Sequence, residues 1–534
     1  MSKPLKIKDP IFGYIEIEDE NFIAVVNSAM FQRLRDIVQT SYPSVYPFAV
    51  HNRFTHSLGV YYLGKIAQKS LSKDIKRLDL NPECNIDELC RTFLLACLMH
   101  DLGHSPFSHT GEKFYFKEKG ENGQPLIWLQ LLKVLDDKDF ISDLHGKDKV
   151  GAEHEIMSAY VSIVNYPEIF NYCDKCFFTR CIIGLKYSDN ADIRNCFIDL
   201  LNSKTIDVDK LDYLIRDSFA TGFKSISIDY VRLLNSVCVI KEKGQLLQGF
   251  NKSALSTLES VILAHDMERK WIQNHPVIKY EGHLVAYMIA KVQSEYEQAG
   301  IQLFSADALT ESGVTKGNTK LCLLADSDIN AYAKRYYGDD SKITEYFTRG
   351  KRKKPLWKSE SEYRFYFENA GVNDEVLTKL EDRFASLEKA LVQQFEFPLI
   401  NRDTLAYFKK EMAEAHNLPK QISEGKIKEL EKTIGLIEVL QEYSEENGFD
   451  FDYVVASVSQ FKTGFNKEEL QNIRVCINDK KSCILKKVLH LFHAEKPREN
   501  YFYLFVDPIV KQKVNAENLA QKIANYVLKE HQNE

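Results

Sequence analysis

A chain of 534 residues is longer than one ordinary hydrophobic core supports, so we expect several domains or one large domain with additions. Hydrophobic residues make up 44% and charged residues 27%, a composition typical of soluble globular proteins. The formal charge of −6 excludes a global electrostatic attraction to nucleic acid or to membranes. An anionic ligand would therefore need local cations or a metal.

The chain shows no pattern typical of export or of a membrane span. Its N-terminus contains no apolar signal segment, and no run reaches the ~18–20 apolar residues that a membrane helix needs. The eleven cysteines are scattered, and we interpret the lone Cys173-x-x-Cys176 pair as buried thiols because no second pair would complete a zinc site. These features predict a cytoplasmic protein with reduced cysteines.

Apolar residues recur at helical spacing through most of the first 300 residues, after a short strand or hairpin at residues 5–17. The pattern predicts helices at residues 22–39, 51–71, 87–99, 191–219 and, as a pair, 251–298. Residues 117–150 are mostly polar apart from an apolar helix near 127–135, so we interpret them as an insertion or lid.

The pattern changes toward the C-terminus. It predicts charged amphipathic helices at 373–396 and 422–444, a strand at 500–507 and a final helix at 515–530. The expected fold class is therefore mainly α, with a helical-bundle core over residues 1–300. An α+β region over residues 301–534 would serve in oligomerisation or regulation.

An apolar helix runs directly into the adjacent pair His100-Asp101. Burying an unpaired carboxylate is costly, whereas imidazole and carboxylate together are suitable ligands for a divalent metal. His56 and Asp209 lie on two other predicted helices, and a bundle can bring such side chains together in its interior. Taken alone, His56 would be a core or cap histidine and Asp209 a helix N-cap. The adjacent pair favours a metal site.

Further polar residues surround this pair in the sequence. His104, His109 and His154 have side chains that titrate near neutral pH, so they are candidates for general acids or phosphate donors. Taken alone, His109 and His154 would be surface histidines. Candidates for holding phosphate charge or a sugar hydroxyl are Arg53, Lys210 and Tyr213.

The order His56, His100-Asp101, Asp209 resembles the H…HD…D pattern of the HD-domain metal phosphohydrolases. The neighbouring segments are similar to the deoxynucleoside triphosphate (dNTP) triphosphohydrolases, in particular the HD domain of the sterile-alpha-motif/HD-domain enzyme and its bacterial relatives. The segments are residues 9–16, 31–35, 51–59, 100–109 and 207–213. The resemblance is strong over residues 9–230 and weaker to about 360, and we expect no sterile-alpha-motif domain before it.

The resemblance implies a divalent metal, either Mn, Mg, Fe, Ni or Zn, and its ligands would be His56, His100, Asp101 and Asp209. The implied catalytic group is His104, His154, His109 and Glu112, the last standing where the family usually has Asp. The implied substrate contacts are Gln39, Arg53, Lys210, Tyr213, Asp217 and Tyr280. We thus expect an HD-domain helical bundle that hydrolyses dNTPs to deoxynucleoside and inorganic triphosphate.

The resemblance also implies a homo-oligomer, a dimer or tetramer, with an allosteric nucleotide site. Gln32 and Arg35 match that site, but Asn27 stands where the family has an acidic residue, which disfavours a guanine-selecting activator. A dNTP or GTP activator, or none, stays open.

Two other functions stay open. The same metal site would suit an HD-family phosphodiesterase, nucleotidase or nuclease. A nucleotide-sensing or nucleic-acid-binding module with a vestigial site could use the basic run at 351–354.

Overall fold

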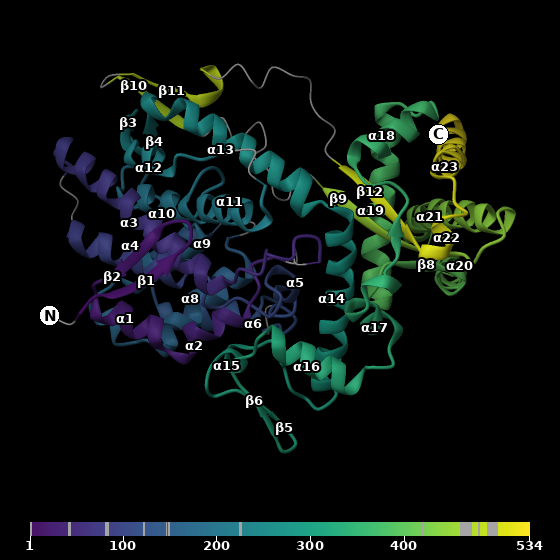
Figure 1. Ribbon diagram of the computed structural model, residues 1–534, viewed down its shortest axis with the longest axis horizontal. Coiled ribbons are helices and arrows are strands. Elements are labelled where there is room, and N and C mark those ends of the chain that lie inside the picture. Colours follow the sequence, from purple (N-terminus) through teal and green to yellow (C-terminus); the bar gives the residue numbers. More distant parts are fainter. Residues whose placement is uncertain are drawn as a thin grey trace. The chain divides into compact units, whose positions relative to one another are not determined.

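The computed structural model describes residues 3–40, 44–80, 85–120, 123–145, 147, 150–223, 227–417, 420–459, 473–478, 481–488 and 500–533. The chain forms two compact units (Figure 1). The first unit comprises Met1–Arg269, Val292–Tyr332 and Gly464–Glu495, and the second comprises Lys270–Lys291, Ala333–Thr463 and Lys496–Glu534.

The division near residue 300 that the sequence suggested is too simple. Residues 292–332 return to the first unit, where Gln302 bonds the carbonyl of Phe114 and Asp326 bonds the backbone of Phe107. Residues 270–291 belong to the second unit instead. The chain crosses between the units more than once, which periodicity along the sequence cannot show.

The first unit is mainly helical, as predicted. Its helices are α1 (Glu20–Asn27), α2 (Ala29–Arg33), α3 (Arg53–Arg77), α4 (Ile86–Met99), α5 (His109–Glu112), α6 (Leu126–Leu135), α7 (Lys138–Leu144), α8 (Glu153–Asn165), α9 (Lys175–Ile183), α10 (Arg194–Leu201), α11 (Val208–Thr221), α12 (Tyr230–Asn235), α13 (Leu255–Glu268) and α15 (Ala306–Leu309). Two helices contribute residues to both units, namely α14 (Pro276–Glu297) and α16 (Asp326–Tyr336).

Strands of the first unit form two hairpins and one larger sheet. The hairpins pair β1 (Leu5–Asp9) with β2 (Gly13–Ile17) and β5 (Val314–Lys316) with β6 (Thr319–Leu321). The sheet has the order β11-β10-β4-β3, with β3 (Val237–Glu242), β4 (Gln245–Asn251), β10 (Arg474–Asn478) and β11 (Lys481–Ile484). Figure 1 shows the yellow-green C-terminal strands beside the teal ones, and β10 runs parallel to β4.

The second unit is α+β, as expected for the C-terminal region. Its helices are α17 (Ser341–Phe347), α18 (Glu360–Asn369), α19 (Asp374–Phe395), α20 (Arg402–Ala415), α21 (Lys420–Glu446), α22 (Pro508–Lys511) and α23 (Ala516–Asn533). Its sheet has the order β7-β12-β9-β8, with β7 (Lys354–Pro355), β8 (Leu399–Asn401), β9 (Asp452–Ser459) and β12 (Asn500–Val506). The core between them includes Trp357, Phe384 and Phe502, all fully buried.

Local capping explains where the helices that carry the predicted metal ligands begin. The side chain of Asn52 accepts the Thr55 N–H at 3.1 Å and starts α3. The side chain of Asp207 accepts the Lys210 N–H at 2.8 Å and starts α11. Because Asp207 caps α11, the side chain of Asp209 is released from the capping role that it could have had.

The predicted helix at 22–39 is interrupted in the structure. Ser28 has extended backbone angles, and its side chain accepts the Phe31 N–H, so one helix ends and α2 begins there. The pair of helices expected over 251–298 is present as α13 and α14. Among the described residues, no helix is long and apolar enough to span a membrane.

Candidate metal centre and catalytic loop

Three helix ends place the predicted metal ligands at one point of the first unit. His56 lies in the first turn of α3, His100 is the residue after α4, and Asp209 lies in the first turn of α11. Asp101 follows His100 directly. The structure buries His56 and Asp101 almost completely and leaves Asp209 partly exposed.

The spacing of these ligand atoms suits one shared cation. His56 Nε2 and His100 Nε2 are 3.3 Å apart, and His100 Nε2 is 3.4 Å from Asp101 Oδ1. The Nε2 atom of His56 is 3.6 Å from Asp101 Oδ2 and 2.9 Å from Asp209 Oδ1. Two ligands bound at ~2.1 Å to one ion lie about 3.0–3.4 Å apart. Two buried imidazole nitrogens that face each other beside carboxylates therefore fit a divalent metal.

The charges of this cluster are those that a cation site needs. Despite burial, His100 and His56 hold the pKa of Asp209 well below its usual range. Burial also opposes the charge of Asp101, but Arg53 and His100 lower its pKa. Both carboxylates are thus ionised at neutral pH. Burial opposes a charge on His56, yet hydrogen bonds to Asp209 and Asp212 raise its pKa to about 10, so a bound metal would replace a proton.

A chain of buried charges behind His56 fixes the orientation of its ring. His56 Nδ1 is 2.7 Å from Asp212 Oδ2, and Arg216 donates to both oxygens of Asp212. Arg216 also donates to Asp9 Oδ2 at 2.9 Å. A carboxylate behind a metal-bound imidazole selects the tautomer whose other nitrogen faces the ion. Gly59 makes room for this contact, because a Cβ there would lie 1.8 Å from Asp212 Oδ1.

The predicted catalytic residues form a second cluster, in which Glu112 is the shared acceptor. Glu112 Oε1 is 2.6 Å from His109 Nδ1, and its Oε2 is 3.0 Å from His154 Nδ1. The ring of His104 stacks on that of His154 with centroids 4.2 Å apart. Neither ring nitrogen of buried His104 has a hydrogen-bond partner among the described residues. The two clusters meet where His104 Nε2 lies 3.4 Å from Asp101 Oδ1.

The two stacked histidines of the second cluster differ in pKa. Burial opposes the charge of His154, but the Glu112 carboxylate raises the pKa of His154 to about 9. Burial and the Arg53 charge hold the pKa of His104 well below its usual range. Despite burial, His154 and His109 keep Glu112 ionised by lowering its pKa. At neutral pH, the His154 imidazole is therefore cationic, and the His104 imidazole stacked on it is neutral.

The loop that carries the second cluster packs closely on α8. Gly103 permits this approach, since a Cβ there would lie 2.3 Å from the backbone nitrogen of Ser158. Further along the same loop, Phe107 and Ser108 have positive φ angles of 56° and 51°. Side chains with a Cβ rarely adopt such angles, so this turn is strained.

Arg53 joins the two clusters. It donates to Asp101 Oδ2 at 2.8 Å and to the Ser108 hydroxyl at 3.0 Å, and its Nη2 atom is 3.5 Å from His109 Nε2. Gln39 is buried nearby, with its carbonyl accepting a weak 3.4 Å bond from Arg53. The side-chain oxygen of Gln39 has no hydrogen-bond partner among the described residues, which leaves it available to a ligand.

The other predicted substrate residues have their own partners. Lys210 Nζ donates to Asp207 and to the carbonyl of Ser203. Asp217 Oδ1 is 2.6 Å from His51 Nε2, a partner that the sequence did not suggest. Tyr213 shares α11 with Asp209. Their contacts with a substrate stay predictions.

Tyr280 is not among the residues that the structure brings together. It belongs to the second unit, where its side chain is 1% exposed and its hydroxyl donates to Glu345. Its ring packs against Phe397 and Phe505 in that unit's core. Tyr280 is thus a core residue of the second unit, and its predicted contact with deoxyribose stays a prediction.

The residues predicted to bind a regulatory nucleotide lie near the surface. Arg35 Nε donates to Gln32 Oε1 at 2.6 Å, and the Arg35 guanidinium lies 3.6 Å from the Phe54 ring centroid. Asn27 is exposed at the end of α1. The regulatory role of all three stays a prediction.

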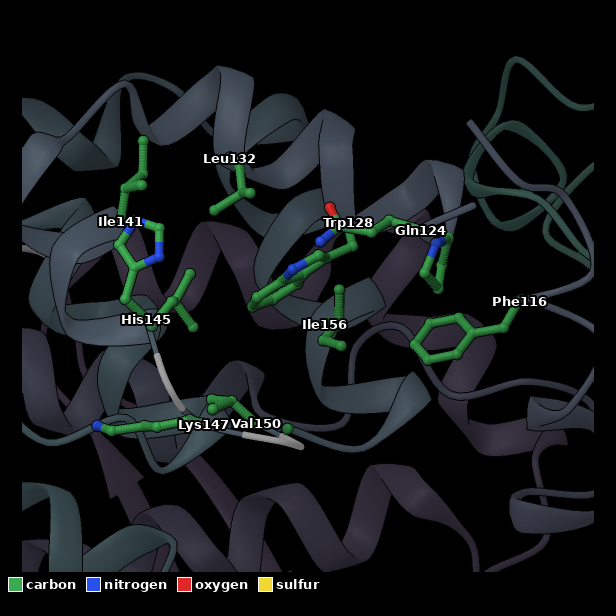
Figure 2. A pocket seen from close by; sticks show the side chains of 12 residues that line it. Phe116, Gln124, Trp128, Leu132, Ile141, His145, Lys147, Val150 and Ile156 are labelled. Carbon is green, nitrogen blue, oxygen red and sulfur yellow. The ribbon is translucent and has the colours of Figure 1, made fainter. Parts of the chain in front are cut away.

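Residues of the predicted insertion line most of a pocket, and Phe116, Gly151 and Ile156 complete it (Figure 2). The pocket has a volume of about 480 Å³ and is lined mainly by apolar side chains, among them Trp128, Phe116 and Ile156. Its lining contains none of the candidate metal ligands or second-cluster residues. Residues 121–122, 146 and 148–149 of the insertion lie outside the described residues, and the lid role stays a prediction.

Sequence reasoning missed the residues that support the ligands rather than supply them. Asp212 and Arg216 lie on the same helix as Asp209, at spacings that a search for buried ion pairs could have used. Asp9 is 207 residues from Arg216, and no sequence signal connects the two.

Comparison with known proteins agrees with the geometry. The family model described as "HD domain" matches residues 53–129, which include His56, His100 and Asp101. HD domains bind divalent metals, and the described His/Asp cluster supplies suitable ligands.

Two curated relatives show the extent of the similarity. An uncharacterized protein of Mycoplasma genitalium is 30% identical over 264 residues, covering 48% of this chain and 53% of that protein. The "Deoxynucleoside triphosphate triphosphohydrolase SAMHD1 homolog" of Dictyostelium discoideum is 30% identical over 296 residues, covering 55% of this chain and 49% of that protein. The matches thus span about half the length of these relatives.

A solved structure extends the similarity of fold. A hypothetical protein from Aquifex aeolicus superposes with a TM-score of 0.56 and 17% identity, covering 97% of this chain and 100% of that one. At this identity the likeness shows the fold alone. The chain therefore contains an HD domain and resembles, over about half its length, proteins named deoxynucleoside triphosphate triphosphohydrolases.

Proposed function

We propose that the protein is a metal-dependent phosphohydrolase that converts dNTPs to deoxynucleoside and inorganic triphosphate. The observation that carries the proposal is the pairing of two clusters. Asp101 Oδ1, in a His/Asp group spaced for a cation, lies 3.4 Å from His104 Nε2, in a group that holds one neutral and one cationic histidine. The relatives named as dNTP triphosphohydrolases support the choice of substrate.

His56, His100, Asp101 and Asp209 would hold the divalent cation, which when bound supplies charge stabilisation to a phosphoryl group and acidifies water. Arg53 lies between the clusters and adds a fixed positive charge where phosphate oxygens would gather. Hydrolysis forms a bond from a water oxygen to the α-phosphorus and breaks the bond from that phosphorus to the 5′-oxygen.

Two stacked imidazoles suit the proton transfers of this step. His104 is neutral, and its unprotonated ring nitrogen, which has no hydrogen-bond partner among the described residues, can accept the proton that the water loses. His154 carries a proton at neutral pH and can give it to the departing 5′-oxygen, while Glu112 orients its ring. The products are then a neutral 5′-hydroxyl and triphosphate.

The test is a product analysis of the purified protein. The four dNTPs are supplied singly and in pairs with Mn²⁺ or Mg²⁺, and anion-exchange chromatography identifies the products. We expect deoxynucleoside and triphosphate in equal amounts, and none after EDTA treatment. Release of pyrophosphate or monophosphate instead would reject the proposal in favour of another HD-type phosphohydrolase.

The structure weakens the alternative of a nucleic-acid module that uses residues 351–354. Arg352 is buried in the second unit, 3.4 Å from Glu281 Oε1, and donates to the carbonyl of Tyr346. Lys353 Nζ lies 3.0 Å from Asp452 Oδ1. Two of the four basic side chains at residues 351–354 thus bind groups within the second unit. The dimer or tetramer and the dNTP or GTP activator remain proposals, for which light scattering with and without each nucleotide is the test.

A further inference from the structure

The strained turn before His109 is held from outside by one distant carboxylate. Asp326, the first residue of α16, is 5% exposed, and its two oxygens accept different backbone N–H groups. Oδ1 accepts from Phe107 at 2.6 Å, and Oδ2 accepts from Val38 at 2.9 Å. All these residues belong to the first unit.

The strain at this turn needs such an anchor. Ser108 has φ 51° and ψ −128°, angles that glycine ordinarily occupies. A non-glycine residue in a sparsely populated region costs about 1–3 kcal/mol and persists only when its surroundings enforce it. The Ser108 hydroxyl also donates to the Val38 carbonyl, so Asp326 and Ser108 together tie the turn to the segment that precedes Gln39.

A buried guanidinium holds the other end of the same loop. Arg33 is 5% exposed and donates to the carbonyls of Leu102 and His104 at 2.8 and 2.9 Å. Its other terminal nitrogen donates to the Leu324 carbonyl at 2.8 Å. Residues 324–326 therefore contact both ends of the loop, one through Arg33 and one through Asp326.

The turn also contacts Arg53, one of the residues proposed to bind phosphate. The Ser108 hydroxyl accepts from Arg53, whose guanidinium in turn binds the metal-ligand candidate Asp101. His109 follows Ser108 directly. A shift of the turn would displace Arg53 and His109 together.

We propose that Asp326, with Arg33, is a positioning residue of the phosphohydrolase: it holds the Phe107-Ser108 turn so that Arg53 and His109 face the metal cluster. This inference rests on the proposed function for its activity readout. Both N–H groups can only donate, so the carboxylate must be ionised to accept both of them. Burial opposes that charge and raises the pKa of Asp326 to about 7.

The test compares Asp326→Asn with Asp328→Asn in the full chain. Asp328 lies in the same first turn of α16, and its side chain accepts the Ala325 N–H at 2.8 Å. Among the described residues it has no hydrogen bond to the loop, so its substitution removes a nearby carboxylate without removing a bond to the turn. In Asp326→Asn, the amide nitrogen would face one of the two backbone donors. We expect kcat to fall about 10- to 100-fold, since misplacement by about 1 Å costs up to that much. Metal content and melting temperature should stay near those of the unsubstituted protein.

Hydrogen–deuterium exchange provides a readout independent of activity. The amides of Phe107 and Val38 should exchange faster in Asp326→Asn and unchanged in Asp328→Asn. A double-substitution cycle separates positioning from general destabilisation. Ser108→Gly removes both the strain and the hydroxyl that contacts Arg53 and Val38, so Asp326→Asn should reduce kcat less in that background than it does alone. Should Asp326→Asn fail to fold, Arg33→Lys, which cannot reach all three carbonyls, is expected to show the same loss of kcat and faster exchange at Gly103 and His104.

Equal exchange and equal kcat in the Asp326 and Asp328 variants would overturn the inference. If the unsubstituted protein hydrolyses no dNTP, the proposed function fails, while exchange at Phe107 and Val38 still decides whether Asp326 holds the turn.

Discussion

The two histidine clusters of the first unit contain similar side chains but differ in how these contact each other. In the metal cluster, His56 Nε2 and His100 Nε2 face each other at 3.3 Å, and most other ligand pairs are 3.4–3.7 Å apart. In the second cluster, Glu112 accepts from His109 at 2.6 Å and forms an ion pair with His154 at 3.0 Å. In one cluster two imidazole nitrogens face each other as they would around a cation, and in the other the imidazoles gather around one carboxylate.

Residue type alone therefore does not identify a metal site. Both groups have histidines and a carboxylate with ligand atoms close enough to hold an ion. In the second cluster the short contacts to Glu112 stabilise a proton on His154. The metal cluster differs because two imidazole nitrogens, those of His56 and His100, face each other at 3.3 Å, a contact that a shared cation explains. We therefore propose that the first cluster binds the metal and that the second transfers protons.

The largest expected effect separates the clusters by metal content. Asp209→Asn removes a ligand charge, so bound metal and triphosphate release should both fall to the detection limit. Elemental analysis by mass spectrometry and product chromatography measure these. Asp199→Asn is a matched control, because Asp199 belongs to the same unit, pairs with Lys186 at 2.7 Å and is not one of the candidate site residues. Full activity of Asp209→Asn would break the assignment.

Substitution in the second cluster should affect the rate alone. Glu112→Gln removes the charge that keeps His154 protonated, so we expect kcat to fall about 10²- to 10⁴-fold, the range for general acid–base catalysis. Metal content should remain that of the unsubstituted protein. Loss of metal together with activity would mean that the second cluster is also a metal site.

The charge behind His56 should have a smaller effect. Asp212→Asn leaves the imidazole without its ionised partner, and losing the carboxylate that orients a metal-bound imidazole costs about 10- to 100-fold in metal affinity. Competition with a fluorescent chelator measures that affinity. An affinity within twofold of the unsubstituted protein would show that the Asp212–Arg216 pair serves folding only.

The smallest expected effect is on stability and depends on pH. The pKa of His154 is raised to about 9, so its ion pair with Glu112 stabilises the folded state fully below pH ~6.5 and is lost as the pH rises through 9. The free energy of unfolding should therefore exceed that of His154→Gln by about 3 kcal/mol at pH 6 and by little at pH 9.5. Chemical denaturation at both pH values tests this. A difference that grows with pH would contradict the protonated state.

The sequence could indicate the candidate metal ligands because each lies in a short local motif at the end of an amphipathic helix. His100-Asp101 follows the apolar run of α4, and Asp209 lies two residues after the cap of α11. It also predicted α6, α19, α21 and β12 closely, since their apolar periodicity is strong. These features depend on neighbours within about four residues.

Other features depend on contacts that periodicity does not encode. Strand β10 pairs parallel with β4 across more than two hundred residues, and the periodicity of the sequence predicted neither of these strands. Asp326 acts on backbone N–H groups, which every residue except proline has, so its partners leave no trace in the sequence. Tyr280 was placed at the substrate by resemblance, but its burial beside Phe505 depends on the fold of the second unit.

The buried bond between Arg216 and Asp9 has a consequence for the order of events during folding. The HD-domain match covers residues 53–129, yet the support for His56 extends from the N-terminal hairpin to the middle of α11. A nascent chain would therefore acquire its oriented metal ligand only after residue 216 had been made and docked. Metal loading would therefore show that the N-terminal hairpin and α11 have already packed against α3, and chains truncated to the matched segment would bind the ion weakly.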